Sequence, residues 1–558
     1  MMTRELALCL ILATTASVSA AEESESFYGT LEPFASEAVY FVLTDRFVNG
    51  DTRNDQRDQG GAFPTFDRPT PGGPEGQTDN VGYLGGDFRG VLDHADYIRE
   101  MGFSSVWITP IIDNPDEAFT GGEPVVWGGM FTDRGKTGYH GYWGVNFWKV
   151  DEHLPSANLG FPEFTARMRE RGLKTVLDIV ANHGSPSFTM PVDQPGYGEV
   201  YGRDGQLLAD HQNLLPEQLR PDQEPLHAFF HAKQDLVQLS NFDEQNPAVV
   251  DYLVDTYLHW IDQGAAAFRI DTIRHVPMPF WQTFTQRIRA KHPGFFMFGE
   301  AFDYKAKNIA PFTHPDQAGV SVLDFPLKKA LDEVFSRTEG DFKRLRKPLY
   351  LTRGPYANPY DLMTFYDNHD MARMDADDEG FIDAHNWLFT ARGIPVIYYG
   401  SESGFMRGTA EHAGNRNYFG TQGIRDAMNH PIRVNLARVA RVRAATPALQ
   451  RGLQVNLELK GDRAAFLRVL QHDGVAQTAL VLLNKGDTAT TFDLKRGLQT
   501  GVWRDALASD ESATLAVSGR IKIEVPAHGL RVFVLDAPVS DRALRSQLRR
   551  AMRHKNGG

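Results

Sequence analysis

The chain has 558 residues, a length that predicts one large unit with smaller attachments rather than a single simple domain. Its 42% hydrophobic and 23% charged residues are ordinary for a globular protein. The formal charge of −13 argues against a nucleic-acid partner, because such proteins bind phosphates through an excess of positive charge. A neutral substrate is consistent with this net negative charge.

Residues 1–20 have the pattern of an export signal. An apolar run over residues 6–13 follows Arg4, and the small residues at 18–20 suit cleavage by a signal peptidase. A short buried helix is the alternative, but acidic, polar sequence follows directly. The run is too short to span a bilayer, and no later apolar stretch is long enough. We therefore expect a secreted or periplasmic protein with no membrane partner. The only cysteine, Cys9, lies within the signal, so no disulfide is expected.

Short β-rich apolar runs alternate with helical patterns along most of the chain, which is typical of parallel β/α units. The runs cover residues 38–43, 104–108, 175–179, 266–270, 295–298, 320–323, 362–365 and 395–399. Eight such strands predict an α/β protein built on a (β/α)8 TIM barrel.

The barrel is expected to be interrupted once and followed by a second unit. Residues 185–241, after the third strand, are too many for an ordinary connection and predict an inserted domain. The barrel then comprises residues 21–184 and 242–445. Short strands and turns without barrel-sized helices predict a C-terminal antiparallel β-sandwich over residues 446–537. For the basic tail, residues 538–558, we expect a solvated or disordered end rather than a site for an anionic surface.

Polar residues fall at the ends of four predicted strands. These are Asp178, Asn182 and His183 at the third, Arg269, Asp271 and His275 at the fourth, Glu300 after the fifth, and His369 with Asp370 after the seventh. In a (β/α)8 barrel the chemistry lies at the carboxyl ends of the strands. We therefore expect these side chains to converge on one mouth of the barrel.

Two of these carboxylates suit the cleavage of an acetal, which needs one acid for the leaving oxygen and one carboxylate for the oxocarbenium-like carbon. Arg269 and Asp271 are two residues apart on a strand and share a face, so the guanidinium keeps Asp271 ionised as a nucleophile requires. A structural Arg–Asp pair is the alternative. Glu300 follows an apolar strand and Gly299, and partial desolvation would raise its pKa as a general acid requires.

Six segments resemble the α-amylase family of retaining α-glucan enzymes. Residues 178–183 (DIVANH), 268–275 (FRIDTIRH), 298–301 (FGEA) and 365–370 (FYDNHD) match its four signature segments in order and on the expected strands. Residues 393–402 (GIPVIYYGSE) look like its eighth strand, and residues 139–143 (YHGYW) like its substrate-facing loop. The N-terminal part, with residues 44–50 (TDRFVNG) and 85–88 (GGDF), is most similar to cyclodextrin glucanotransferases and related bacterial α-amylases.

The resemblance implies a role for each matching residue. Asp271 would be the nucleophile, Glu300 the acid/base and Asp370 the carboxylate that grips the sugar hydroxyls and favours ring distortion. The sugar ligands next to the cleaved bond would be Arg269, His183 and His369, with Tyr142 as stacking platform. His140 is grouped with them, although a lone histidine is usually structural. The expected partner is an α-glucan polysaccharide or oligosaccharide bound by a monomer.

A first Ca²⁺ site is predicted near the N-terminus. Its ligands would come from Asn49, Asp51, Asn54, Asp55, Gly85 and Asp87. Oxygen-rich turns suit Ca²⁺, which takes roughly six to eight oxygen ligands. A polar turn without metal is the alternative. The cluster also resembles a calcium loop of the cyclodextrin glucanotransferases.

A second Ca²⁺ site, common across the family, would use Asn182, the His275 carbonyl and an acidic residue of the inserted domain. The matching position here is Asn241, an amide in place of a carboxylate, which removes charge from the site. Asp243 could compensate for that loss.

The resemblance implies a secreted α-amylase-type hydrolase that cleaves α-1,4 bonds of starch or maltooligosaccharides. Cyclodextrin formation is disfavoured, because Val237 replaces the central aromatic of the cleft and the usual two further C-terminal domains are not in this sequence. Phe302 matches an acceptor-side aromatic of the transferases, so an α-glucan transglycosylase is the alternative.

A non-catalytic glucan-binding relative is disfavoured because all three carboxylates are present. A zinc hydrolase would require His140, His183, His275 and His369 to share one metal, and no helical His-x-x-x-His spacing among these four supports it.

Overall fold

The computed structural model describes residues 25–556 except 75–78, 130–131, 337–339, 411, 496 and 509–512. The predicted export signal, residues 1–20 with Cys9, lies outside the described residues. Among the described helices, none combines the length and apolar character needed to cross a membrane.

Eight parallel strands form the predicted barrel. They are β1 (Val39–Val42), β2 (Ser105–Ile108), β5 (Lys174–Ile179), β10 (Ala267–Ile270), β11 (Phe296–Gly299), β12 (Ser321–Val322), β13 (Met363–Thr364) and β14 (Ile394–Tyr398). The order is β12-β11-β10-β5-β2-β1-β14-β13, and a parallel bridge between Leu323 and Met363 joins the two end strands. The TIM-barrel prediction is confirmed, and each observed strand overlaps its predicted run.

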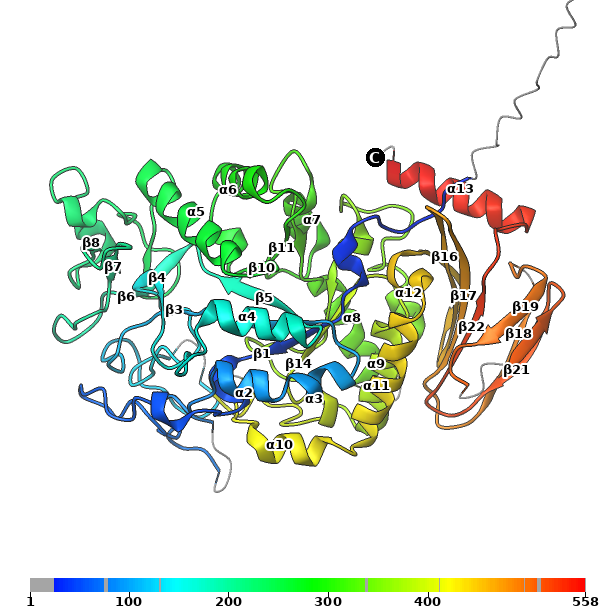
Figure 1. The fold of residues 1–558 in the computed structure, drawn as a ribbon, viewed down its shortest axis with the longest axis horizontal. Helices are drawn as coiled ribbons and strands as arrows, with labels where there is room; N and C mark the ends of the chain where they lie inside the picture. Colours follow the sequence, from blue (N-terminus) through cyan, green and yellow to red (C-terminus); the bar gives the residue numbers. More distant parts are fainter. Residues whose placement is uncertain are drawn as a thin grey trace, which may run out of the picture.

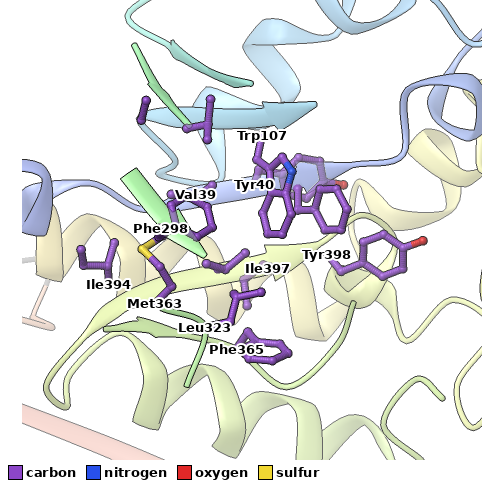
Figure 2. Packing of buried hydrophobic residues seen from close by; sticks show 14 of the residues in the cluster. Val39, Tyr40, Trp107, Phe298, Leu323, Met363, Phe365, Ile394, Ile397 and Tyr398 are labelled. Carbon is purple, nitrogen blue, oxygen red and sulfur yellow. The ribbon is translucent and has the colours of Figure 1, made fainter. Parts of the chain in front are cut away.

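Branched and aromatic side chains fill the barrel (Figure 2). The ring of Phe41 stacks on Trp107 at 3.8 Å between centroids, and Trp107 meets Phe298 edge-on at 5.4 Å. Every residue of β1, β2, β10 and β11 is buried, as expected for parallel strands covered on both faces. Because the interior is packed with side chains, a substrate can bind only at an end of the barrel.

Helices surround the barrel sheet (Figure 1). The longer ones are α4 (Phe161–Glu170), α5 (Pro247–Asp262), α6 (Met278–Lys291), α8 (Phe325–Phe335), α9 (Asp378–Leu388) and α11 (Pro431–Ala444). Shorter helices are α1 (Thr44–Phe47), α2 (Phe88–Asp93), α3 (Ala95–Glu100), α7 (Ala306–Ile309), α10 (Gly420–Ala427) and α12 (Pro447–Arg451). Local sequence sets their starts: the Asn246 side chain accepts from Ala248 N before α5, and Asp324 accepts from Leu327 N before α8.

The insertion after the third barrel strand is present. It contains β6 (His183–Pro186), β7 (Glu199–Tyr201), β8 (Leu207–Asp210) and β9 (Leu239–Asn241). Strands β6 and β9 pair antiparallel, with His183 opposite Asn241. The insertion therefore leaves and rejoins the barrel through one strand pair, which fixes its base beside the mouth.

The C-terminal unit is the predicted antiparallel sandwich. One sheet has the order β15-β16-β17-β22-β19-β20 and the other pairs β18 with β21. Their bounds are β15 (Leu453–Lys460), β16 (Arg463–His472), β17 (Val475–Asn484), β18 (Thr490–Leu494), β19 (Gly501–Asp505), β20 (Thr514–Val517), β21 (Ile521–Val525) and β22 (Gly529–Leu535). Leu467 and Leu480 of the first sheet share a core with Phe492 and Val525 of the second.

The prediction for the basic tail is wrong. Residues Arg542–Asn556 form helix α13, which lies against the sandwich (Figure 1). Leu544 and Leu548 are buried in the sandwich core, and Arg549 forms an ion pair with Glu25. The many positive charges of this segment led to the prediction of a solvated end. Its apolar residues nevertheless recur at helical spacing, and they anchor the helix.

Replacing Leu548 by alanine tests this packing. The side chain is fully buried, so its loss should lower the stability of the sandwich by about 3 kcal/mol. Urea unfolding followed by circular dichroism measures the change. Gln547→Ala, at an exposed neighbour, is the control. Equal midpoints for the two variants would contradict the observed packing.

Candidate active site

One buried arginine organises the mouth of the barrel. Arg269 lies in β10, and its Nη1 is 2.9 Å from Asp178 Oδ1 and 2.8 Å from Asp271 Oδ1. Its Nη2 is 2.9 Å from Glu300 Oε2. Burial disfavours its charge, but the surrounding carboxylates outweigh that effect and raise the pKa of Arg269 well above its usual value. The residue therefore remains a cation between three acids.

Strand register explains why these groups meet. Arg269 is level with Asp178 of β5 and with Phe298 of β11. Glu300 follows β11 directly, and its N–H donates to the carbonyl of Ile270 at 2.8 Å. Asp271 and Glu300 are thus neighbours on adjacent strands, both at the carboxyl ends. The predicted convergence of these residues is confirmed.

Asp178 is the carboxylate that positions Arg269. Besides Arg269, it accepts hydrogen bonds from Trp107 Nε1 at 2.9 Å and from the Tyr142 hydroxyl at 2.8 Å. Burial raises the pKa of Asp178 to about 7, against the opposing effect of Arg269. Sequence reasoning placed Asp178 at a strand end without giving it a role. Its contacts identify it as the residue that orients Arg269 and Tyr142.

Glu300 has the environment of a general acid. Burial, opposed by Arg269 and reinforced by Asp370 and Asp271, raises the pKa of Glu300 well above its usual value. The N–H of Thr272 lies 3.4 Å from Glu300 Oε2. Thr272 has a φ of 46°, an uncommon left-handed conformation for a β-branched residue, directly after Asp271. This bend turns the chain around the two carboxylates.

Asp370, in the segment after β13, is in a more open position. Its side chain is 31% exposed, and its Oδ2 is 3.2 Å from His369 Nε2. Its Oδ1 is 2.8 Å from Arg416 Nη2, and Arg416 Nε donates to the His369 carbonyl at 2.9 Å. Sequence reasoning missed Arg416, because it lies in an irregular segment after the last barrel strand, outside the recognised motifs.

Tyr142 and the three histidines predicted as sugar ligands, His140, His183 and His369, are buried at this mouth. The rings of Tyr142 and His369 stack at 5.3 Å, and His140 Nδ1 accepts from the Tyr142 N–H at 3.1 Å. Burial lowers the pKa of both His140 and His183, which favours their neutral forms. Neutral imidazoles can offer hydrogen bonds to a sugar without adding charge to the site.

Phe302 comes two residues after Glu300 and is 45% exposed. Its carbonyl accepts from Arg274 Nη1 at 2.6 Å, which fixes the backbone beside the acid. An exposed ring in a fixed position can stack on a sugar, as expected for an acceptor-side residue.

The residues of the first predicted metal site come together. A Cβ on Gly85 would lie within 2.5 Å of side-chain atoms of Asn49 and Asp55, so the three positions are in close contact. Asp87 accepts from the N–H groups of Gly50 and Asp51. Asn49 Oδ1 and Asn54 Oδ1 are buried without a hydrogen-bond donor. Buried oxygens that lack a donor fit an oxygen-seeking cation such as Ca²⁺.

At the second predicted site, a different carboxylate is present. Asp235 Oδ2 lies 3.4 Å from Asn182 Nδ2 and 3.1 Å from His275 Nδ1. Asp243 lies beside His231 instead, at 3.8 Å. Asn241 pairs with His183 at the base of the insertion. Asp235 was missed because the match to the family placed the acidic position at Asn241.

Known proteins resemble the chain along most of its length. The pattern of the family described as "Alpha amylase, catalytic domain" matches residues 41–431. A cyclomaltodextrin glucanotransferase from Klebsiella oxytoca is 29% identical, over 89% of this chain and 77% of that enzyme. An α-amylase from Niallia circulans is 26% identical, over 92% of this chain and 94% of that enzyme.

Solved structures agree with this result. The structure of a cyclomaltodextrin glucanotransferase with a three-domain ABC distribution superposes with a TM-score of 0.70 at 28% identity, covering 90% of this chain and 99% of that one. Among sequence relatives, the chain spans 77% of the length of the Klebsiella oxytoca cyclomaltodextrin glucanotransferase and 50% of that from Niallia circulans. With its three carboxylates assembled at one mouth of the barrel, the chain belongs to the α-amylase family of glycoside hydrolases and transferases.

Proposed function

We propose that the protein is an α-amylase-type hydrolase that cleaves α-1,4 bonds of starch or maltooligosaccharides with retention of anomeric configuration. The observation that carries the proposal is the buried guanidinium of Arg269, which holds Asp271 and Glu300 at once. Sharing one guanidinium keeps the two carboxyl groups close together. Retaining enzymes need a separation of about 5 Å, whereas inverting enzymes leave room for a water molecule between them.

The chemistry follows in two steps. Asp271 attacks the anomeric carbon while Glu300 donates its proton to the leaving glycosidic oxygen, which forms a covalent glycosyl ester. Glu300, now a carboxylate, then takes a proton from water, and the water oxygen displaces Asp271 from the anomeric carbon. Two inversions give net retention. Asp370, Tyr142 and His369 hold the sugar during both steps.

A second candidate is transfer of the glycosyl group to another sugar rather than to water. Phe302, exposed beside Glu300, supports it, because an aromatic on the acceptor side can favour a sugar over water. The chain is also similar to a cyclomaltodextrin glucanotransferase that has three domains. A three-domain layout therefore does not argue against transfer. Hydrolysis remains the proposal, since the Niallia circulans α-amylase matches along 94% of its length.

We propose one Ca²⁺ ion at Asn49, Asp51, Asn54, Asp55, Gly85 and Asp87, and a second at Asn182, Asp235 and His275. The donorless buried oxygens of Asn49 and Asn54 support the first. The carboxylate of Asp235 supplies the negative charge that Asn241 lacks, which supports the second. A bound ion would fix the segments that supply its ligands and take no part in the chemistry.

We also propose that the protein is exported as a monomer, by a signal over residues 1–20, and meets its substrate outside the cytoplasm. The charged Arg4 and the apolar run that follows it support the export signal.

Glu300→Gln should separate acid catalysis from nucleophilic attack. Loss of the proton donor should lower kcat on maltoheptaose by about 10³-fold. Ester formation from α-maltosyl fluoride, measured by fluoride release, should fall far less, because fluoride leaves without protonation. In the wild type, activity should fall as the pH rises through the raised pKa of Glu300, and this alkaline limb should vanish for the fluoride substrate. Equal losses on both substrates would rule out Glu300 as the acid.

The products from amylose and maltoheptaose decide between hydrolysis and transfer. Chromatography should show short linear maltooligosaccharides that are absent with Asp271→Asn, because that variant lacks the nucleophile. Cyclic products, or oligosaccharides longer than maltoheptaose from maltoheptaose, would mean that transfer dominates. No turnover of either substrate would reject the proposed function.

Removal of Ca²⁺ should destabilise the protein. At a concentration of 100 times Kd, one bound ion adds about 2.7 kcal/mol to the free energy of unfolding, so a chelator should lower the Tm and added Ca²⁺ should restore it. Elemental analysis should find fewer ions in Asn49→Ala than in Asp58→Ala, a control at an exposed acid nearby. A metal-free protein whose Tm is insensitive to chelator would contradict both sites.

A further inference from the structure

Two exposed aromatic rings follow the catalytic acid. Phe302 and Tyr304 are 45% and 42% exposed, and they are the only Phe, Tyr or Trp among the large hydrophobic side chains exposed in the described part of the chain. Their ring centroids lie 5.9 Å apart, and both rings contact Phe325 at the start of α8, at 4.7 and 6.2 Å. A buried phenylalanine thus supports both rings from beneath.

The backbone between the rings is fixed. Asp303 accepts from the Lys305 N–H and from Asn308 Nδ2, both at 2.7 Å, and lies 3.4 Å from Arg274 Nη1. Tyr304 therefore stands in a defined position, and stacking a ligand on it costs little conformational entropy.

A cavity of about 710 Å³ opens beside Tyr304. Its wall includes Lys328 and Asp332 of α8, and Met371 with Asp375 from the segment after β13. Met371 directly follows the catalytic Asp370, so the cavity begins where the active site ends. Its volume is within the range of pockets that hold small organic ligands.

Four of the charged side chains in this cavity form two ion pairs. Lys328 Nζ is 2.5 Å from Asp332 Oδ2, and Arg344 Nη1 is 3.1 Å from Glu333 Oε2. Arg373, which is buried, donates to the backbone carbonyls of Tyr399 and Asn415. Paired charges attract neither an anion nor a cation, but they offer hydrogen bonds to hydroxyl groups. An aromatic face beside such groups fits a neutral sugar.

We propose that Tyr304 and this cavity form a further subsite for the α-glucan chain, on the leaving-group side and beyond the sugar that contacts Phe302. The inference rests on the proposed cleavage of α-1,4-glucans. The ring of Tyr304 stacks on the apolar face of a glucose unit, while Asp332 and Asp375 meet its hydroxyl groups. The subsite lengthens the reducing-end fragment that the enzyme holds before cleavage.

Maltoheptaose with a fluorescent label at its reducing end tests this directly. The length of each labelled product equals the number of glucose units bound on the leaving-group side at cleavage. With the wild type, labelled fragments of three or more units should be prominent. With Tyr304→Ala, the ratio of these to labelled fragments of one or two units should fall about fivefold to tenfold, the effect expected for one stacking contact. Tyr304→Phe keeps the ring and should keep the wild-type ratio.

Each other outcome is informative. An unchanged ratio in Tyr304→Ala, with the variant folded by circular dichroism, would overturn the subsite while leaving the proposed function intact. A shift toward longer labelled fragments would place Tyr304 on the opposite side of the cleaved bond and would also overturn it. No turnover of maltoheptaose by the wild type would overturn the proposed function and this inference together.

Discussion

The charge of Arg269 is the constraint on which the rest of the site depends. A guanidinium with no exposed surface is tolerable only if carboxylates surround it, because an unpaired buried charge costs several kcal/mol. Asp178, Asp271 and Glu300 meet that requirement, and in doing so they are held near one another. One guanidinium interacts with three carboxyl groups and does not stabilise the ionised form of all three equally. Burial therefore leaves the pKa of Glu300 raised. The same arrangement thus yields a fixed nucleophile position and a proton donor.

The barrel supplies the geometry that this charge requires. Parallel register places Asp178, Arg269 and Phe298 side by side on three neighbouring strands. The nucleophile and the acid directly follow the last residues of β10 and β11. Packed aromatic rings such as Trp107 close the barrel beneath Asp178, so the charged groups face the mouth alone. The inserted domain begins at His183, one strand pair from the site, and so forms part of the same mouth. Loops can then vary without disturbing the acids.

Much of this was predictable, because the strands and the catalytic residues are both local features. Each barrel strand is a short apolar run, and Asp271 and Glu300 come directly after such runs. Contacts between distant segments were not predictable. Arg416 reaches Asp370 from a segment without periodicity, and Asp235 approaches Asn182 only because the insertion folds back. The helical tail was misjudged because its charge dominated its composition, whereas Leu544 and Leu548 decide its packing.

Trapping the covalent intermediate tests the central claim most directly. A 5-fluoro-α-glycosyl fluoride reacts quickly to form the covalent ester, and this ester is hydrolysed only slowly. Peptide mass spectrometry then locates the modified residue. The arrangement around Arg269 predicts one label per chain, on Asp271, and none in Asp271→Asn. A label on Asp178 or Asp370, or turnover without any covalent intermediate, would contradict the roles assigned to the three carboxylates.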